Sequence, residues 1–452
     1  MSTDHQLRRD ISLAGAVMLG LGSIIGTGVF VSIGIAAGVA GANVLPAILI
    51  AALLAICNGL SSAQLAAAHP VSGGTYEYGY RWLTPTAGFI AGWLFLCAKS
   101  ASAATAALGL AGYLQLMLGV ADEGIFGLGG FLSNVLIALV MLGAMTIVVV
   151  VGIKRTTIVN SAIVGVTLVT LAGFVIVGLG PAISGANEHL HGLLSFNSDG
   201  HDQLSNSSNQ LFSMFSATAL MFVAYTGYGR IATLGEEVAE PRRTIPRAMI
   251  LTLAISMVVY LSVGFVAVSV VGPEALSRVT GRWAAPLLRV ASQLETPWVE
   301  KLLAVGAIAA MLGVMLNLLL GLSRVVLAMS RRQDLPAHFV RINARGVPLR
   351  ATLLVALIVG GLVCVGDVRL SWSFSAMTVL IYYAFTNLCA IRIDQSDRIF
   401  PVWPAWCGLA GCFSLVAFIQ WRVLIVGGIV IGLGLIWRMI NQSVVNRKNE
   451  SR

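Results

Sequence analysis

The sequence predicts an all-α membrane protein with 12 transmembrane helices. Of its 452 residues, 57% are hydrophobic and only 10% are charged, whereas soluble domains contain about 25% charged residues. A chain of this composition cannot cover a globule with polar groups, so its outer surface is expected to face lipid. The apolar residues also fall into runs of roughly 20, the length that crosses the hydrocarbon of a bilayer.

Twelve apolar segments are expected to form the spans. They cover residues 13–38, 45–67, 86–118, 131–151, 158–180, 210–234, 248–271, 299–329, 351–366, 371–391, 403–420 and 424–440. The first run follows Arg8 and Arg9, as the apolar part of a signal peptide does, but it is too long for one and equally apolar runs follow it. We therefore interpret it as a retained first span behind a cytoplasmic tail at 1–12.

The Lys and Arg residues indicate the orientation of the spans. With the N-terminus inside, 20 of the 28 fall on the inner side and 6 on the outer side, while Lys99 and Arg324 fall within spans. Cytoplasmic loops of membrane proteins are enriched in Lys and Arg. Both termini, including the tail at 441–452, are therefore expected in the cytoplasm, with the chain in the plasma or inner membrane. The same distribution explains the net charge of +9 without a nucleic-acid partner.

The sequence indicates neither a cofactor nor a catalytic group. The six cysteines lie in or beside apolar runs and form no C-x-x-C pair. The long outer loop at 181–209 contains His189, His191 and His201, but their spacing fits no standard metal site, and a solvated loop explains them better. The chain lacks the G-x-x-x-x-G-K-[ST], H-E-x-x-H and G-x-S-x-G motifs, so neither ATP hydrolysis nor another enzymatic activity is expected.

The first span contains an unusual cluster of glycines. Gly20, Gly22, Gly26 and Gly28 fall within nine residues, and each glycine weakens a helix by about 1 kcal/mol relative to alanine. Two interpretations are open at this point. Small residues let neighbouring helices pack closely, as in G-x-x-x-G pairs; alternatively, the backbone unwinds and exposes its amides and carbonyls to a binding cavity.

The sixth span repeats the pattern about 200 residues later, with glycines beside hydroxyls and a charge at 222–230. Each cluster opens a block of five spans, 13–180 and 210–391. Paired interrupted helices at matching places in two halves point to a transporter binding site. Half-helix ends present amides to an anion and carbonyls to a cation, and a free amino acid carries both a carboxylate and an ammonium.

Four motifs in order resemble the amino acid–polyamine–organocation permease family. They are Gly22-Ser-Ile-Ile-Gly26-Thr27-Gly28-Val-Phe30, Ala66-Ala-Ala-His-Pro70-Val-Ser-Gly73-Gly74-Thr-Tyr76-Glu-Tyr78, Gly235-Glu236-Glu237-Val-Ala-Glu240-Pro241-Arg242-Arg243-Thr-Ile-Pro246-Arg247, and Ser323-Arg324 through Leu335-Pro336. The resemblance covers most of the chain. It implies a five-plus-five inverted repeat with discontinuous first and sixth helices, two extra helices at 392–440, and alternating access around a central site for a small-molecule amino acid. A proton or a sodium ion is the candidate coupling ion.

The resemblance also implies which residues touch the substrate. They are Ile24, Thr27, Gly28, Tyr225, Thr226 and Gly227. The residues of the first span are expected at or beside the substrate carboxylate. Those of the sixth span are expected to supply carbonyls to the ammonium and a wall to the pocket. For Tyr225 two interpretations remain: it forms a gate over the substrate, or it only packs against its neighbours.

Further residues are candidates for gating or coupling. They are Gly26, Arg230, Glu237 and Asn317. For Arg230 and Glu237 the alternative is a plain ion pair at the inner surface, and for Asn317 it is a bond to another helix. Proton-coupled members of the family carry a lysine in span five where our alignment places Thr167. This difference argues against proton coupling by that route.

Lys99 is the one charged residue near the middle of a span. A charge at this depth costs about 2.5–3.5 kcal/mol on insertion scales, so we do not expect it to face lipid. It either donates to backbone carbonyls as a structural pin, or it lies in the cavity and reads a substrate carboxylate or cycles a proton. The spans contain no clear buried acid to neutralise it, which favours neutral or acidic amino acids as substrates. The alternatives are an amine or polyamine transporter and a non-transporting amino acid sensor of the same fold.

Overall fold

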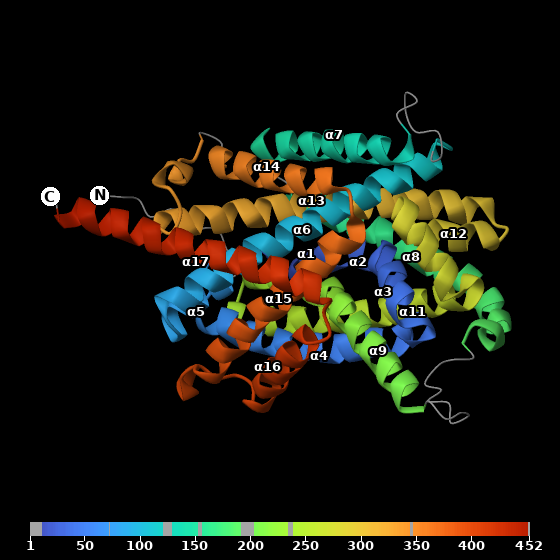
Figure 1. The fold of residues 1–452 in the computed structure, drawn as a ribbon, viewed down its shortest axis with the longest axis horizontal. Coiled ribbons are helices and arrows are strands. Elements are labelled where there is room, and N and C mark those ends of the chain that lie inside the picture. Colours follow the sequence, from blue (N-terminus) through green and yellow to red (C-terminus); the bar gives the residue numbers. More distant parts are fainter. Residues whose placement is uncertain are drawn as a thin grey trace.

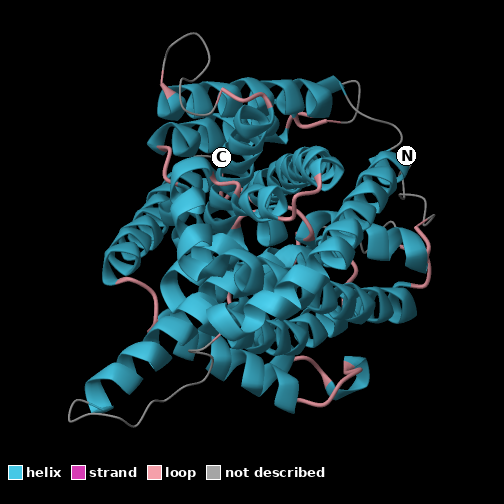
Figure 2. Ribbon diagram, turned by 90° about the vertical axis from the view of Figure 1, so that its right-hand side faces the viewer, coloured by secondary structure: helices cyan, strands magenta, loops and turns pink. Residues whose placement is uncertain are grey.

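The computed structural model describes residues 11–71, 73–120, 129–151, 156–190, 203–233, 238–343 and 347–450. Within these ranges the chain is helical, apart from loops and one isolated β-bridge between Ile11 and Val238 (Figure 2). The elements in chain order are α1 (Leu13–Ile24), α2 (Thr27–Phe30), α3 (Ser32–Ala40), η1 (Gly41–Asn43), α4 (Val44–Ala68), α5 (Thr75–Trp82), α6 (Pro85–Met117), α7 (Gly130–Val151), α8 (Thr156–His189), α9 (Gln203–Tyr225), η3 (Thr226–Tyr228), α10 (Gly229–Thr233), α11 (Pro241–Trp283), α12 (Pro286–Gln293), α13 (Pro297–Arg331), η4 (Ala337–Val340), α14 (Leu349–Val365), α15 (Val368–Ile391), η5 (Gln395–Asp397), α16 (Trp403–Val416) and α17 (Trp421–Glu450).

The helices form a bundle in which some are central and others peripheral. α1, α2 and α6 lie in the middle, between α7 and α14 on one side and α4 and α16 on the other (Figure 1). In the most apolar 18-residue stretch of α6, 83% of the residues are buried, whereas the corresponding shares in α7 and α17 are only 28% and 22%. The two peripheral helices are more apolar than the central one, so their exposed side chains require an apolar surrounding. In the described residues, ten helices are long and apolar enough to cross a membrane, and α14 and α16 are shorter apolar helices.

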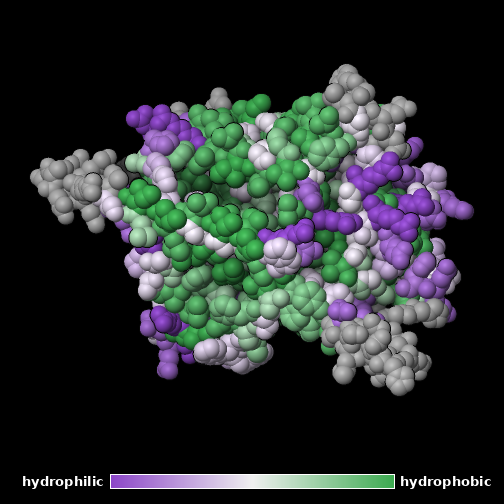
Figure 3. All heavy atoms as spheres, in the orientation of Figure 1, coloured by the Kyte–Doolittle hydropathy of each residue, from purple (hydrophilic) through white to green (hydrophobic). Residues whose placement is uncertain are grey.

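The surface agrees with a bundle that spans a bilayer. Hydrophobic residues cover most of the middle of the molecule, and hydrophilic residues gather toward the two ends of its long axis (Figure 3). An apolar patch of this size is incompatible with a water-facing monomer. The all-helical membrane architecture predicted from the composition is therefore confirmed. We call the end that carries α5 and η4 the α5 face, and the opposite end, which carries α12, the α12 face (Figure 1).

The two glycine-rich spans are interrupted in the structure. α1 ends at Ile24, Ile25 is extended (φ −80°, ψ 97°), and α2 begins only after Gly26. α9 ends at Tyr225 and continues as the tighter turn η3 before α10 resumes. The first interruption is thus a true unwinding, whereas the second is a local change of helix type. Both lie where the glycines predicted them.

The α12 face is closed by close packing over the end of the first span. α11 bends at Gly272, whose φ of 76° favours glycine, and its second part lies against α3. A Cβ on Gly38 would come within 2.3 Å of the Ser277 hydroxyl, so only glycine permits this approach. Arg369 of α15 donates to the Ser277 carbonyl at 2.6 Å and to its hydroxyl at 2.9 Å. These bonds hold the second part of α11, which we call the lid, in place.

Helices α8, α9 and α17 extend beyond the apolar runs that predicted them. α8 continues through Pro181 to His189 and α9 begins at Gln203, so the loop predicted at 181–209 is largely helical at both ends. A Cβ on Gly185 would lie 2.3 Å from the carbonyl oxygen of Ser269, and this contact with α11 supports the extension. α17 likewise runs on to Glu450 through the predicted tail at 441–452. Hydropathy marks the edge of the membrane, and a helix need not end there.

Candidate functional site

The two interruptions meet at the centre of the bundle. η3 packs directly on the end of α1, where a Cβ on Gly227 would lie 2.3 Å from the Ser23 carbonyl oxygen. The last four carbonyls of a helix lack the usual amide donors four residues ahead, so the ends of α1 and α9 bring carbonyls that other groups can cap to one place. One of these carbonyls is capped locally, because the Thr226 hydroxyl donates to the Val223 carbonyl at 2.7 Å. Another is capped from outside, because the Tyr383 hydroxyl of α15 donates to the Thr226 carbonyl at 3.2 Å.

A cavity of about 50 Å³ lies beside this junction. Its walls come from α1, α6, η3, α10, α13 and α15. The lining residues are Ser23, Phe95, Lys99, Thr226, Gly227, Gly229, Arg230, Thr233, Val314, Asn317, Leu318, Gly321 and Tyr383. The described lining contains two cationic side chains and no carboxylate. The cavity reaches toward the α5 face, because Thr233 lies next to Gly74, which directly precedes α5.

Lys99 projects into this cavity from α6. Its side chain is buried (8% exposed), and Nζ donates to the Thr226 hydroxyl at 2.9 Å. The same hydroxyl donates a hydrogen bond to the Val223 carbonyl, so the ammonium is linked through Thr226 to the interrupted sixth span. This hydroxyl is a neutral partner for a buried charge, and buried charges are normally paired with an opposite charge. The arrangement leaves Lys99 able to accept an anionic partner in the cavity.

The structure separates the predicted site residues into two groups. Lys99, Thr226, Gly227, Arg230 and Asn317 line the cavity. Ile24, Gly26, Thr27, Gly28 and Tyr225 are buried at or next to the breaks and are not among the lining residues. Gly26 faces Val314 of α13, since a Cβ on it would lie 2.4 Å from that side chain. Glu237 lies outside the described residues, so its predicted gating role has no structural description.

Two buried hydroxyls in the second group have no hydrogen-bond partner among the described residues. They belong to Thr27, the first residue of α2, and to Tyr225, the last residue of α9. An unpaired buried hydroxyl costs about 1–3 kcal/mol. The two groups therefore mark positions at which a further polar group would be favourable.

Asparagine side chains connect three helices beside the first break. Asn317 of α13 donates to the Asn160 side-chain oxygen at 3.0 Å, and Asn160 of α8 donates to the Met18 carbonyl of α1 at 2.9 Å. Asn317 therefore both lines the cavity and bonds another helix. Thr167, in contrast, only donates back to Ile163 within its own helix. The polar residue of span five that reaches the first span is Asn160, which the sequence did not single out.

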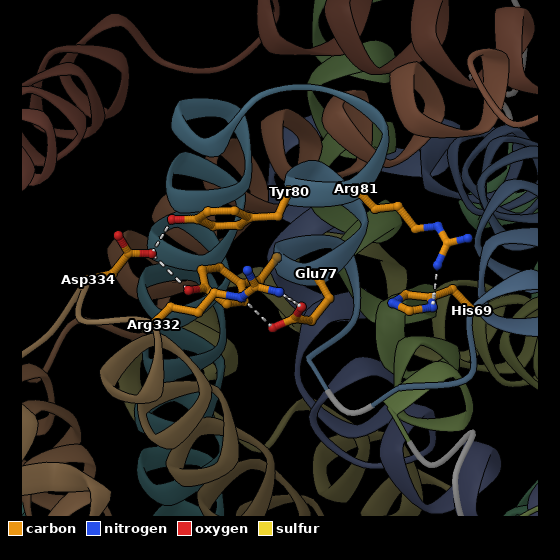
Figure 4. Close-up of polar contacts among 7 residues, drawn as sticks. His69, Glu77, Tyr80, Arg81, Arg332 and Asp334 are labelled. Carbon is orange, nitrogen blue, oxygen red and sulfur yellow. Dashed lines mark hydrogen bonds and ion pairs between the residues drawn. The ribbon is translucent and has the colours of Figure 1, made fainter.

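A polar cluster occupies the α5 face (Figure 4). The Asp334 carboxylate is 5% exposed and accepts hydrogen bonds from the Tyr76 and Tyr80 hydroxyls at 2.8 and 2.6 Å. Burial, followed by the Asp334 carboxylate, raises the pKa of both phenols, so they remain donors. The Trp437 indole of α17 donates to the Asp334 backbone carbonyl at 3.1 Å. The cluster joins α5, the end of α13 and α17.

An ion pair extends the cluster (Figure 4). Arg332 donates to both carboxylate oxygens of Glu77, at 3.1 and 2.5 Å, and its guanidinium lies 4.5 Å above the ring of Tyr80. Hydrogen bonding to Glu77 raises the pKa of Arg332. On the far side of α5, Arg81 bonds the His69 ring at 3.0 Å, and burial together with Arg81 lowers the pKa of His69. A guanidinium can only donate, so His69 accepts on Nδ1 in this arrangement. These contacts hold α5 against the end of α13.

Comparisons with known proteins identify the family of the chain. The sequence model of the family described as "Amino acid permease" matches residues 15–443. An uncharacterized transporter of Mycobacterium tuberculosis is 36% identical over 99% of this chain and 94% of its own length. The branched-chain amino acid permease BcaP of Bacillus subtilis is 27% identical over 97% of this chain and 92% of its own length. The crystal structure of MhsT in complex with L-phenylalanine covers 91% of this chain and 98% of its own, with a TM-score of 0.59 at 16% identity. The chain is therefore a multi-pass membrane transporter, not an enzyme, and belongs to the amino acid permease family.

Proposed function

We propose that this transporter moves amino acids across the plasma or inner membrane by alternating access, and that it favours neutral or acidic substrates. The observation that carries the proposal is the cavity at the junction of the two interrupted spans, which contains Lys99 and has no carboxylate in its described lining. Such a cavity offers backbone polar groups to the two charges common to all amino acids. It offers a cation, and no anion, to the side chain.

The two ends of a zwitterion find complementary groups in the two spans. In α2, the amides at Thr27 and Gly28 start a helix and have no intrahelical acceptor, and the free Thr27 hydroxyl is a further donor beside them. We assign the substrate carboxylate to this side. Carbonyls at the end of α1 and in η3 attract the ammonium, with the Tyr225 ring as the neighbouring wall.

The small volume of the cavity supports a moving site. One water molecule requires about 10–15 Å³ of cavity space, so a cavity of about 50 Å³ holds only a few water molecules. We expect its walls to separate further when an amino acid binds. Movement of the first and sixth spans within a five-plus-five repeat, 13–180 against 210–391, would open one face at a time. The lid of α11 on the α12 face and the polar cluster on the α5 face are the contacts that would break alternately.

The orientation follows from the distribution of positive charge. We place the α5 face in the cytoplasm, since Lys and Arg are enriched on that side of membrane proteins, and both termini are then cytoplasmic. A proton or a sodium ion is the candidate for coupling. BcaP is a permease of branched-chain amino acids, which supports a neutral substrate here, and Lys99 extends the candidates to acidic ones.

Reconstitution tests the proposal. Purified protein in proteoliposomes should accumulate radiolabelled leucine or glutamate, and protein-free vesicles should not. Putrescine, a diamine, should not accumulate, because the described cavity lining offers no carboxylate. Each substrate is measured with a sodium gradient, with a proton gradient and with neither, which identifies the coupling ion. Amino acid binding without flux under all three conditions would identify a sensor, and uptake of putrescine alone would identify a polyamine transporter; either result overturns the proposal.

A further inference from the structure

Tyr260 of α11 contacts both interrupted spans through one hydroxyl. Its side chain is completely buried, and its hydroxyl lies 2.7 Å from the Ile24 carbonyl oxygen and 3.2 Å from the Ala224 carbonyl oxygen. Ile24 is the last residue of α1, and Ala224 is the last but one of α9. Both carbonyls belong to the final turn of a helix, where intrahelical partners are lacking. One phenol of α11 therefore faces one such carbonyl from each break.

Neighbours from both broken spans hold the Tyr260 side chain in place. The Tyr225 ring of α9 packs at a centroid distance of 4.9 Å. On the other side, a Cβ on Gly28 of α2 would lie 2.3 Å from the Tyr260 hydroxyl oxygen. Glycine at position 28 is thus what allows the hydroxyl to come this close. The ring is wedged between the two spans, and its rotation is restricted by both.

The hydrogen-bonding capacity of the hydroxyl does not saturate the two carbonyls. A phenol has one proton to donate, and each carbonyl oxygen has two lone pairs. The shorter distance directs the proton mainly to Ile24, which leaves Ala224 only weakly satisfied. Lone pairs therefore remain on both oxygens, at a fixed separation. An ammonium carries three N–H donors and can fill the remaining lone pairs of both.

We propose that Tyr260 is the positioning residue that orients the Ile24 and Ala224 carbonyls for the α-ammonium of the substrate. This inference rests on the proposed function, because it assigns that ammonium to the junction of the two spans. Ile24 follows Ser23, and Ala224 lies two residues before Thr226; Ser23 and Thr226 both line the cavity. Both carbonyls thus lie one or two residues along the chain from the cavity wall, where a substrate in an enlarged cavity can reach them.

Other buried tyrosines cap carbonyls of the broken spans without linking them. Tyr113 of α6 is equally buried and donates to the Phe30 carbonyl at 2.8 Å. Tyr383 donates to the Thr226 carbonyl at 3.2 Å. Among the described residues, Tyr260 is the one tyrosine whose hydroxyl reaches both broken spans. Tyr113 therefore provides a matched control for the loss of a buried tyrosine-to-carbonyl hydrogen bond.

Tyr260→Phe tests the assignment, since it removes one hydroxyl and keeps the ring. We measure inhibition of labelled amino acid uptake by the unlabelled amino acid and by its des-amino analogue, which retains the carboxylate. The wild type should prefer the amino acid strongly. In Tyr260→Phe the KM should rise about tenfold with a smaller change in kcat, and the preference over the analogue should fall about tenfold. Tyr113→Phe should lower thermal stability comparably and leave that preference unchanged.

The outcomes separate the inference from the proposed function. If the wild type transports no amino acid, the proposed function fails. If the wild type transports and Tyr260→Phe retains its full preference for the amino group, or weakens both ligands equally, Tyr260 is only a structural tether and the inference fails. Should Tyr260→Phe yield too little folded protein, Gly28→Ala displaces the same hydroxyl from the opposite side. It is then expected to reduce the preference in the same way, and a retained preference overturns the inference.

Discussion

Lys99→Gln is expected to reduce the uptake of acidic amino acids about tenfold relative to neutral ones. Glutamine can still donate to the Thr226 hydroxyl, which now accepts from Lys99 at 2.9 Å, so the local packing is largely kept. The change removes the positive charge from a cavity whose described lining has no carboxylate. Only a substrate with a side-chain carboxylate should lose an ionic partner.

The measurement is kcat/KM for glutamate and for leucine in proteoliposomes. Lys301→Gln provides the matched control, because Lys301 is an exposed lysine at the beginning of α13 and loses the same charge outside the cavity. Its glutamate-to-leucine ratio should equal that of the wild type. An unchanged ratio in Lys99→Gln would show that Lys99 is a structural pin.

Gly227→Ala is expected to abolish most uptake, with a loss of more than about tenfold. The added Cβ would lie 2.3 Å from the carbonyl oxygen of Ser23 and 2.4 Å from its carbonyl carbon. Because these atoms are backbone, no rotamer change relieves the clash, and overpacking of this kind costs about 1–3 kcal/mol. In the variant, the two broken spans must therefore move apart at the point where we place the substrate.

Gly143→Ala in α7 is the control for a glycine substitution in a helix. A Cβ there meets nothing within 4 Å, so uptake should be unchanged and thermal stability should rise slightly, because alanine favours the helix. Uptake and melting temperature are measured for both variants. Wild-type uptake in a folded Gly227→Ala variant would contradict the close contact between the two spans.

The sequence predicted the interruptions because their cause is local. Four glycines in nine residues of the first span weaken the helix wherever it packs, and α1 ends within that cluster. Lys99 was also predictable, because a charge at mid-span has few places to lie. Its partner Thr226 stands 127 residues away in the sequence, so the bond itself depends on the packing of α6 against η3.

Tyr260 and Asn160 could not have been selected from the sequence. Tyr260 stands in an apolar run, where a buried tyrosine usually packs, and its acceptors are backbone carbonyls that become available only because α1 and α9 end there. Asn160 gains its role from Asn317, which is 157 residues away. For Asn317, cavity lining and a bond to another helix were open alternatives, and the structure has both. Long-range packing decides such roles, and periodicity does not record it.

The central claim is that the junction of the two broken spans recognises the α-carboxylate and the α-ammonium together. Competition against uptake of the preferred amino acid tests it most directly, with two analogues of that substrate: one lacks the amino group and the other lacks the carboxylate. Each charge is expected to contribute about 1.5–3 kcal/mol through charge-assisted hydrogen bonds. The account predicts that each analogue competes at least about tenfold more weakly than the parent. Competition by either analogue as strong as that of the parent amino acid would contradict it.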